Sequence, residues 1–348
     1  MFKLIYSQRY VFQNKRMFPL TYTCMRHKTQ EKKKEEKYKI FNVKEYWFNK
    51  YMNYIKNYEN VLEKNFPRTI HVYRIFSVGT KDFIQEAIKW LMILKKEKID
   101  GIDTLTTDEL RILHTMRKDI IKLCPVLLIS AIPFTNYIIF PLAYHFPRYF
   151  LTSHYWTLQQ KLDFMLLEHK KRLKHNRPLF RCMQAEFHNI KNRTLRLKWS
   201  GIIACLGSGT HPDVNDIIAC SALFADKPYS LHSLKRRHTI ELLGIHNISY
   251  WKLFKKLSLL ERGMLIKKMD ESIQKEGGTI AMSNDAIRWA LSFRGLNPAN
   301  MSIECMRNWL EKWLTVSNIV EDETLSLLLH CPILLAYNHP TNWILVYK

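Results

Sequence analysis

An uncharged run of 24 residues, from Leu123 to Phe146, constrains the fold of this chain more than any other feature. As one helix it would span about 36 Å, which exceeds the roughly 30 Å of a bilayer's hydrocarbon core. The run contains one amide, Asn136, and three prolines at eight-residue intervals, Pro125, Pro133 and Pro141. Proline costs about 3 kcal/mol inside a soluble helix, whereas membrane helices tolerate it where other groups satisfy the freed carbonyls. We therefore predict a single kinked transmembrane helix, with a buried hairpin of a soluble core as the alternative.

Glycine is scarce, with ten in 348 residues, or about 3% against a usual ~7%. Hairpin-rich β folds and nucleotide-binding loops need positive-φ positions that glycine supplies, so its scarcity favours helices. The sequence contains neither G-x-G-x-x-G nor G-x-x-x-x-G-K, which disfavours dinucleotide enzymes and P-loop NTPases. The predicted fold class is all-α.

Cysteine and histidine spacing gives no sign of a metal site or a catalytic site. The seven cysteines are odd in number and form no C-x-x-C, and the fourteen histidines form no H-E-x-x-H. A disulfide framework and a structural zinc site are therefore disfavoured. No Ser/His/Asp or Cys/His arrangement indicates catalysis. We expect a protein that is not an enzyme and has no cofactor, metal or small-molecule substrate.

The amino-terminal 30 residues contain six basic residues, and the first acidic residue is Glu31. This composition is typical of a mitochondrial presequence, with a basic tail as the alternative. The predicted organisation is a presequence and charged linker (1–36), aromatic-rich amphipathic helices (37–119), the transmembrane segment (120–147) and a helical domain (148–348). More basic residues follow the uncharged run than precede it, which favours a carboxyl-terminal domain in the mitochondrial matrix.

Apolar residues recur at helical spacing in seven stretches of the carboxyl-terminal domain. Ser283 is expected to cap one of the helices, and Gly295 is expected to end it. The basic run at residues 235–237 is interpreted as a solvated turn. The seven stretches are 155–174, 178–191, 214–225, 250–271, 284–294, 301–315 and 322–336.

Charge is uneven within this domain. Residues 161–198 hold eleven basic and three acidic residues, whereas residues 279–348 hold five and six. The first region is therefore a candidate for contacts with RNA phosphates, and the terminal helices are expected to pack. Anionic lipid would attract the same charges, and a basic surface without a partner also stays open. The candidate phosphate-binding residues are Lys170, Lys171, Arg172, Lys174, Arg177 and Arg181.

Three strings resemble the LETM family of mitochondrial inner-membrane proteins, and their order fits its short members best. They are HFPRYFLTSHYWT at 145–157, GTHP at 209–212 and LSLLLH at 325–330. Residues 294–314 also resemble the family's ribosome-binding domain, with Arg294, Gly295, Leu296, Arg307, Trp309 and Trp313 as signature positions. The resemblance implies a 14-3-3-like helical bundle in the matrix that docks mitochondrial ribosomes.

The chain departs from the long LETM proteins at positions that matter for function. Those proteins have a glutamate, associated with cation/proton exchange, in the place of Asn136, and an amide cannot release a proton. The run that starts at Asp213 resembles a calcium loop but lacks its glycine and terminal glutamate. We therefore predict ribosome docking at the inner membrane and support of mitochondrial membrane structure and function. The alternatives are a component of potassium/proton homeostasis and a membrane-organising scaffold. The expected partners are the mitochondrial ribosome and inner-membrane lipid, with a homo-oligomer left open.

Overall fold

The computed structural model describes residues 67–130, 132 and 135–347. The predicted presequence and linker, residues 37–66 of the aromatic-rich segment and Pro133 lie outside the described residues. The chain divides into two compact units, Met1–Arg74 and Ile75–Lys348. The second unit contains the helices that carry the candidate site.

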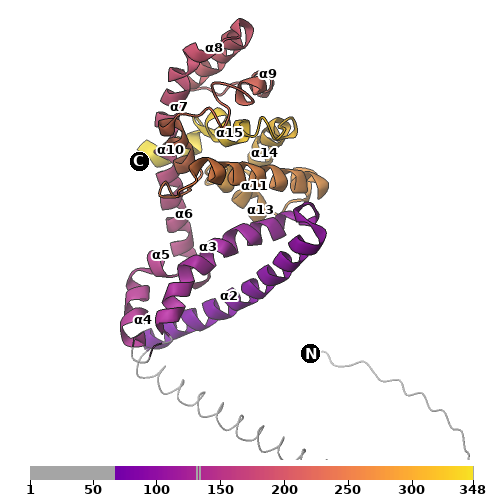
Figure 1. The fold of residues 1–348 in the computed structure, drawn as a ribbon. Helices are drawn as coiled ribbons and strands as arrows, with labels where there is room; N and C mark the ends of the chain where they lie inside the picture. The colour runs from indigo at the N-terminus through magenta and orange to yellow at the C-terminus, as the bar shows by residue number, and fades with distance from the viewer. Residues whose placement is uncertain (1–66, 131, 133–134, 348) are drawn as a thin grey trace, which may run out of the picture. The chain divides into compact units, whose positions relative to one another are not determined.

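The described residues form helices and no strand, which confirms the all-α prediction for that part of the chain. Figure 1 shows α2 (Pro67–Asp100) and α3 (Thr107–Ser130) running in opposite directions below a larger group of helices. The α-helices of the described residues are α2 Pro67–Asp100, α3 Thr107–Ser130, α4 Asn136–His145, α5 Pro147–Phe150, α6 Leu158–Leu173, α7 Asn176–Ala185, α8 Arg193–Gly207, α9 Val214–Ala219, α10 Arg236–Ile245, α11 Lys255–Lys275, α12 Gly278–Ala281, α13 Asn284–Arg294, α14 Ile303–Asn318, α15 Ser326–Ala336 and α16 Pro340–Tyr347.

The larger core forms around α15, in which every residue is buried. The helix packs against α11, α14, α10 and α7. Its apolar residues join side chains of α8, α13 and α14 in one continuous cluster that includes Trp199 and Trp313. The expectation that the terminal helices pack is therefore confirmed for α14 and α15. Ser283 and Gly295 also act as expected, because the Ser283 hydroxyl caps α13 and Gly295 ends it with φ of 98°.

The uncharged run does not form one continuous helix. Helix α3 ends at Ser130 and α4 begins at Asn136, so the prediction of a single kinked transmembrane helix is not confirmed. At the end of α3 the Ile129 carbonyl accepts from the Ile132 amide at 3.1 Å and from the Thr135 hydroxyl at 2.5 Å. Pro125 and Pro141 lie inside α3 and α4. Among the described residues no helix has the length and apolar character needed to cross a bilayer.

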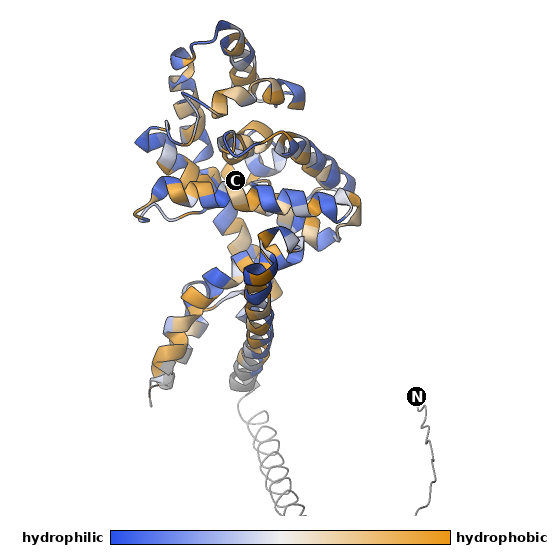
Figure 2. Cartoon of the chain, turned by 45° about the vertical axis from the view of Figure 1, so that its right-hand side comes forward, coloured by the Kyte–Doolittle hydropathy of each residue, from blue (hydrophilic) through white to orange (hydrophobic). Residues whose placement is uncertain are grey.

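The last turns of α3 and helix α4 carry apolar side chains on their exposed side as well as on their buried side. Leu123 and Ala143 are buried in a second, smaller core that also contains Phe83 of α2 and Tyr155. Figure 2, coloured by hydropathy, shows many hydrophobic residues along the helices that extend away from the larger group. The exposed residues of these two helices and of the turn between them include Leu127, Leu128, Ile129, Ile132, Ile138, Leu142 and Tyr144. This is an unusually apolar surface for a helical hairpin in water.

Asp270 of α11 lies at the centre of the larger core and is almost fully buried. One carboxylate oxygen accepts hydrogen bonds from Nε and Nη2 of Arg294. The other accepts from the Trp313 indole at 3.0 Å and the Ser317 hydroxyl at 2.6 Å. Helices α11, α13 and α14 are therefore joined through one charged group. A buried ion pair of this kind contributes little net stability, but removal of one partner leaves the other charge uncompensated.

We therefore expect Asp270→Ala to lower the free energy of unfolding by about 3–5 kcal/mol. Urea unfolding of the detergent-purified chain, followed by far-ultraviolet circular dichroism, measures this loss. The matched control is Glu271→Ala, because the next residue on the same helix is half-buried and pairs with Lys268 at 3.2 Å. The control should cost less than about 1 kcal/mol. Equal losses for the two variants would contradict the assigned role of Asp270.

Candidate functional site

The basic residues at the junction of α6 and α7 divide between the surface and the interior. Four are exposed: Lys171, Lys174, Arg177 and Arg181. Lys170 is half-buried, and Arg172 is buried. Among the described residues, none of the four exposed residues forms an ion pair with a carboxylate. Their charge is therefore directed to solvent.

Local sequence explains why this charge points outward. Helix α6 begins with a capping box between Thr157 and Gln160, and its last turn is basic, which suits the negative end of the helix dipole. Helix α7 buries Leu179 and Met183, so Arg177 and Arg181 lie together on its outer face, one turn apart.

The junction is held against α10 by a close contact. The His175 Nδ1 atom lies 2.8 Å from the Glu241 carboxylate. A Cβ atom on Gly244 would lie 2.4 Å from the His175 ring, so only glycine allows this approach. Helices α7 and α10 consequently pack side by side.

Arg172 has a structural role that the sequence analysis did not predict. Its Nε donates to the Ile245 carbonyl at 2.6 Å, and its other two nitrogens donate to the carbonyls of Ser292 (2.6 Å) and Phe293 (3.1 Å). These carbonyls lie at the carboxyl ends of α10 and α13, where few backbone donors remain; the Ser292 carbonyl also accepts from the Gly295 amide at 3.3 Å. Burial lowers the pKa of Arg172 to about 10. Because its donors are occupied in the interior, Arg172 does not belong to the phosphate-binding set, and that prediction is corrected.

A second basic cluster lies next to α7 and was missed as a site. The run at residues 235–237 was interpreted as a solvated turn, but Arg236 and Arg237 form the first turn of α10. Lys235 pairs with Glu186 at the end of α7, at 2.6 Å. This pair and the packing of α10 on α7 place the start of α10, with Arg236 and Arg237, beside α7. Only tertiary packing joins these residues to the first cluster.

The position of this second cluster is unfavourable for α10 itself. A helix N-terminus carries partial positive charge, and acidic residues are preferred there. Helix α10 has no acidic residue in its first turn and no side-chain cap at Lys235. Two arginines at this end cost a few tenths of a kcal/mol each. Their presence is better explained by binding than by helix stability.

We call the exposed residues Lys171, Lys174, Arg177, Arg181, Arg236 and Arg237 the basic surface. The described residues contain no group of three or more His, Cys, Asp or Glu side chains placed to hold a metal. Asp213, the first residue of the calcium-like run, caps α9 by accepting from the Asn215 amide. The six exposed cations of the basic surface are suited to binding polyanions.

Comparison with known proteins identifies the family of this chain. The sequence profile described as "LETM1-like, RBD" matches residues 105–334. The chain belongs to the LETM1-like RBD family. A relative from Xenopus tropicalis named "LETM1 domain-containing protein 1" is 30% identical over 83% of this chain and 83% of its own length. The human protein of the same name is 28% identical over 81% of this chain and 79% of its own length. No solved structure matches the chain.

Most of the residues that the sequence analysis expected as signature positions lie in the interior. Arg294, Leu296 and Trp313 are fully buried, and Trp309 is nearly so and donates from its indole to the Leu335 carbonyl at 2.9 Å. Arg307 is half-buried, and Gly295 is the left-handed residue after α13. These residues specify the helical bundle of this family member. Its contacts with a partner must be made by other side chains.

We expect Arg172→Ala to lower the free energy of unfolding by about 3 kcal/mol, because it removes the charged donor of the Ile245 carbonyl and one of two donors from each of the Ser292 and Phe293 carbonyls. The control is Lys171→Ala, which removes an exposed neighbour of the same charge and should change stability by less than about 0.5 kcal/mol. Urea unfolding of the detergent-purified chain measures both. If Arg172→Ala is as stable as the control, the guanidinium does not hold α10 and α13 together.

Proposed function

We propose that this chain docks mitochondrial ribosomes at the matrix side of the inner membrane through its basic surface. The observation that carries the proposal is that the exposed cations of α7 and of the start of α10 lie next to one another and face solvent. Ribosomal RNA offers a dense array of phosphates, and exposed Lys and Arg side chains bind such arrays without reading sequence. RBD denotes a ribosome-binding domain, so the family name supports the same partner. The proposed activity is binding and includes no chemical step.

The uncharged run supplies a means of attachment to the membrane in this proposal. Exposed apolar residues lie on the last turns of α3 and on α4, and Leu128 is 66% exposed. In water this surface would be a liability, whereas in a bilayer it would be solvated by lipid. Basic residues then begin at Arg148 and continue through α6 and α7, as expected for the side of a membrane protein that faces the matrix. Attachment keeps the basic surface near ribosomes that synthesise membrane proteins, which raises their local concentration.

Charge reversal at four positions tests the docking proposal. We expect the combined substitution of Lys171, Lys174, Arg177 and Arg181 by Glu to reduce co-sedimentation with mitochondrial ribosomes by at least 100-fold in apparent affinity, because phosphate contacts become repulsive. The wild-type affinity should also fall steeply as salt is raised, with a log–log slope set by the number of phosphate contacts. Arg172 is left unchanged so that the bundle stays folded.

The matched control reverses Lys81, Lys89, Lys95 and Lys98, which are four exposed lysines of α2. Both variants change the net charge by the same amount, so a non-specific effect of charge would weaken docking equally. If both variants bind ribosomes equally weakly, or if the variant of the basic surface binds them as wild type does, docking through the basic surface is contradicted.

A separate variant tests membrane attachment. Leu128→Arg places a charge in the apolar surface of α3 and should cost about 3 kcal/mol if that position lies in hydrocarbon. The variant should move from the membrane pellet to the supernatant after carbonate extraction of mitochondria. Asn215→Arg, at an exposed polar position of α9, should leave the distribution unchanged. If Leu128→Arg stays in the pellet to the same extent as the control, this surface is not the anchor.

A further inference from the structure

The loop between α10 and α11 exposes large apolar side chains without burying any of them. Trp251 is 84% exposed and Leu253 is 87% exposed, and Tyr250 and Phe254 are also exposed. Exposed apolar area costs free energy, at about 25 cal/mol per Å². Four such residues within five positions are therefore not explained by folding.

The base of this loop is fixed in place. Asn247 adopts the left-handed conformation with φ of 52°, and the Ile248 amide donates to the Leu243 carbonyl at 2.9 Å. The Asn247 side chain also donates to Glu168 of α6. At the other end Leu259 of α11 is fully buried. The exposed side chains therefore stand on an ordered turn between two packed helices.

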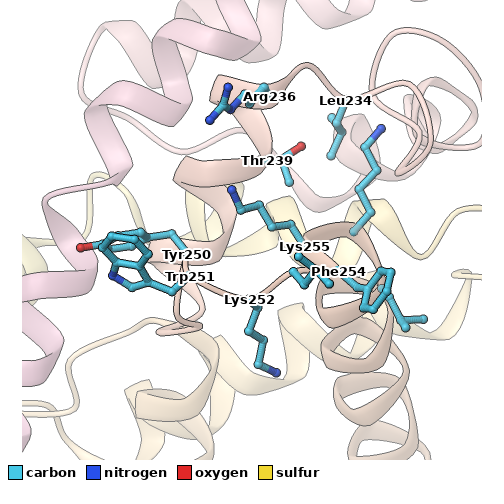
Figure 3. Close-up of a pocket in the computed structure, with 11 residues that line it drawn as sticks. Leu234, Arg236, Thr239, Tyr250, Trp251, Lys252, Phe254 and Lys255 are labelled. Carbon is cyan, nitrogen blue, oxygen red and sulfur yellow. The ribbon is translucent and has the colours of Figure 1, made fainter.

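A hollow of about 710 Å³ lies between this loop and the start of α10. Figure 3 shows Tyr250 and Trp251 together on one side, Arg236 and Thr239 of α10 across from them, and the Lys255 amine extending toward the space between. The volume falls within the range of about 300–1,000 Å³ typical of small-ligand sites. The charged residues that line it are Arg236, Lys252, Lys255 and Lys256, and no acidic residue lines it.

The lining offers two kinds of contact at once. The Tyr250 and Trp251 rings lie 5.5 Å apart and are inclined by 36°, so most of the Trp251 face remains free. A free indole face stacks on any nucleobase, and neighbouring cations bind the attached phosphate. The Lys256 amine is already held by the His232 carbonyl at 2.6 Å. Figure 3 shows the Lys252 side chain extending away from the hollow, which leaves Arg236 and Lys255 as the cations for a phosphate.

We propose that this hollow binds an unpaired nucleotide of RNA, with Trp251 stacked on the base and Arg236 and Lys255 on its phosphate. The inference rests on the proposed function, because Arg236 belongs to both the hollow and the basic surface. The hollow therefore adjoins the basic surface at the start of α10, so an RNA strand bound to the basic surface could extend into it. The stacking site adds a preference for single-stranded over duplex RNA, since paired bases present no free face.

A bilayer and an acidic peptide are the competing occupants. A loop that inserts into a bilayer presents apolar side chains alone, whereas here cations of α10, the loop and α11 line an open hollow beside the aromatic rings. An acidic peptide would be attracted to the same cations but would make no use of a bare indole face. The observations therefore favour a nucleotide.

The test measures binding of the full-length, detergent-purified chain to a fluorescent 12-nucleotide single-stranded RNA and to a duplex of the same sequence. Wild type should prefer the single strand, and Trp251→Ala should weaken its binding by roughly 5- to 100-fold while leaving duplex binding and the salt slope unchanged. Trp251→Phe keeps a stacking face and should restore most of the affinity. Tyr149→Ala, which removes an exposed aromatic ring of α5, is the control and should have no effect.

Several outcomes would overturn this inference. The first is that Trp251→Ala binds single-stranded RNA as tightly as wild type does. The second is that the variant loses single-stranded and duplex binding equally. The third is that the variant loses binding only to cardiolipin-containing vesicles or to poly-glutamate. Binding of free AMP as tightly as of the 12-mer would assign the hollow to a free nucleotide instead. A Trp251-dependent preference for single strands supports the site even if ribosomes fail to co-sediment, in which case the docking proposal alone fails. Ribosome binding that needs the α7 cations but not Trp251 leaves docking intact and removes the stacking site.

Discussion

The bundle depends on how its interior accommodates three guanidinium groups, of which one forms an ion pair with a carboxylate among the described residues. Arg172, Arg262 and Arg294 are all buried, and Asp270 forms an ion pair only with Arg294. Arg172 is held by carbonyl oxygens at the ends of α10 and α13. Helix C-termini carry partial negative charge, so they replace the missing carboxylates. The hydrogen bonds of Arg172 thus fix the ends of α10 and α13 relative to each other.

Arg262 shows the same principle with different partners. Its guanidinium donates to the Phe293 carbonyl at 3.2 Å and lies 3.6 Å from the centre of the Phe293 ring. Burial lowers the pKa of His114 to about 2, so its neutral ring accepts a hydrogen bond from Arg262 at 3.3 Å. The contact links α3 to α11. The helix that enters the proposed membrane anchor is therefore coupled directly to the buried cations of the bundle.

The sequence predicted the class of fold and much of the bundle, because apolar spacing and caps act locally. Ser283 and Gly295 could be assigned from neighbouring residues alone. Hydropathy alone predicts one unbroken segment from Leu123 to Phe146. The interruption between Ser130 and Asn136 could be expected from Pro133, because proline has no backbone N–H to donate within a helix. Arg172 and Arg236 were both misinterpreted for a different reason. Sequence shows a charge but not whether a helix terminus or solvent faces it, and only the packing of α7 against α10 decides that.

Photo-crosslinking from position 181 tests the central claim most directly, because it reports what lies against the basic surface in intact mitochondria. A photoreactive residue in place of Arg181 would be compared with the same residue in place of Lys95 on α2, which is also exposed. Docking through α7 predicts that ribosomal RNA or ribosomal protein is crosslinked from position 181 and not from position 95. Crosslinks from position 181 to lipid alone, or equal ribosomal crosslinking from both positions, would contradict it.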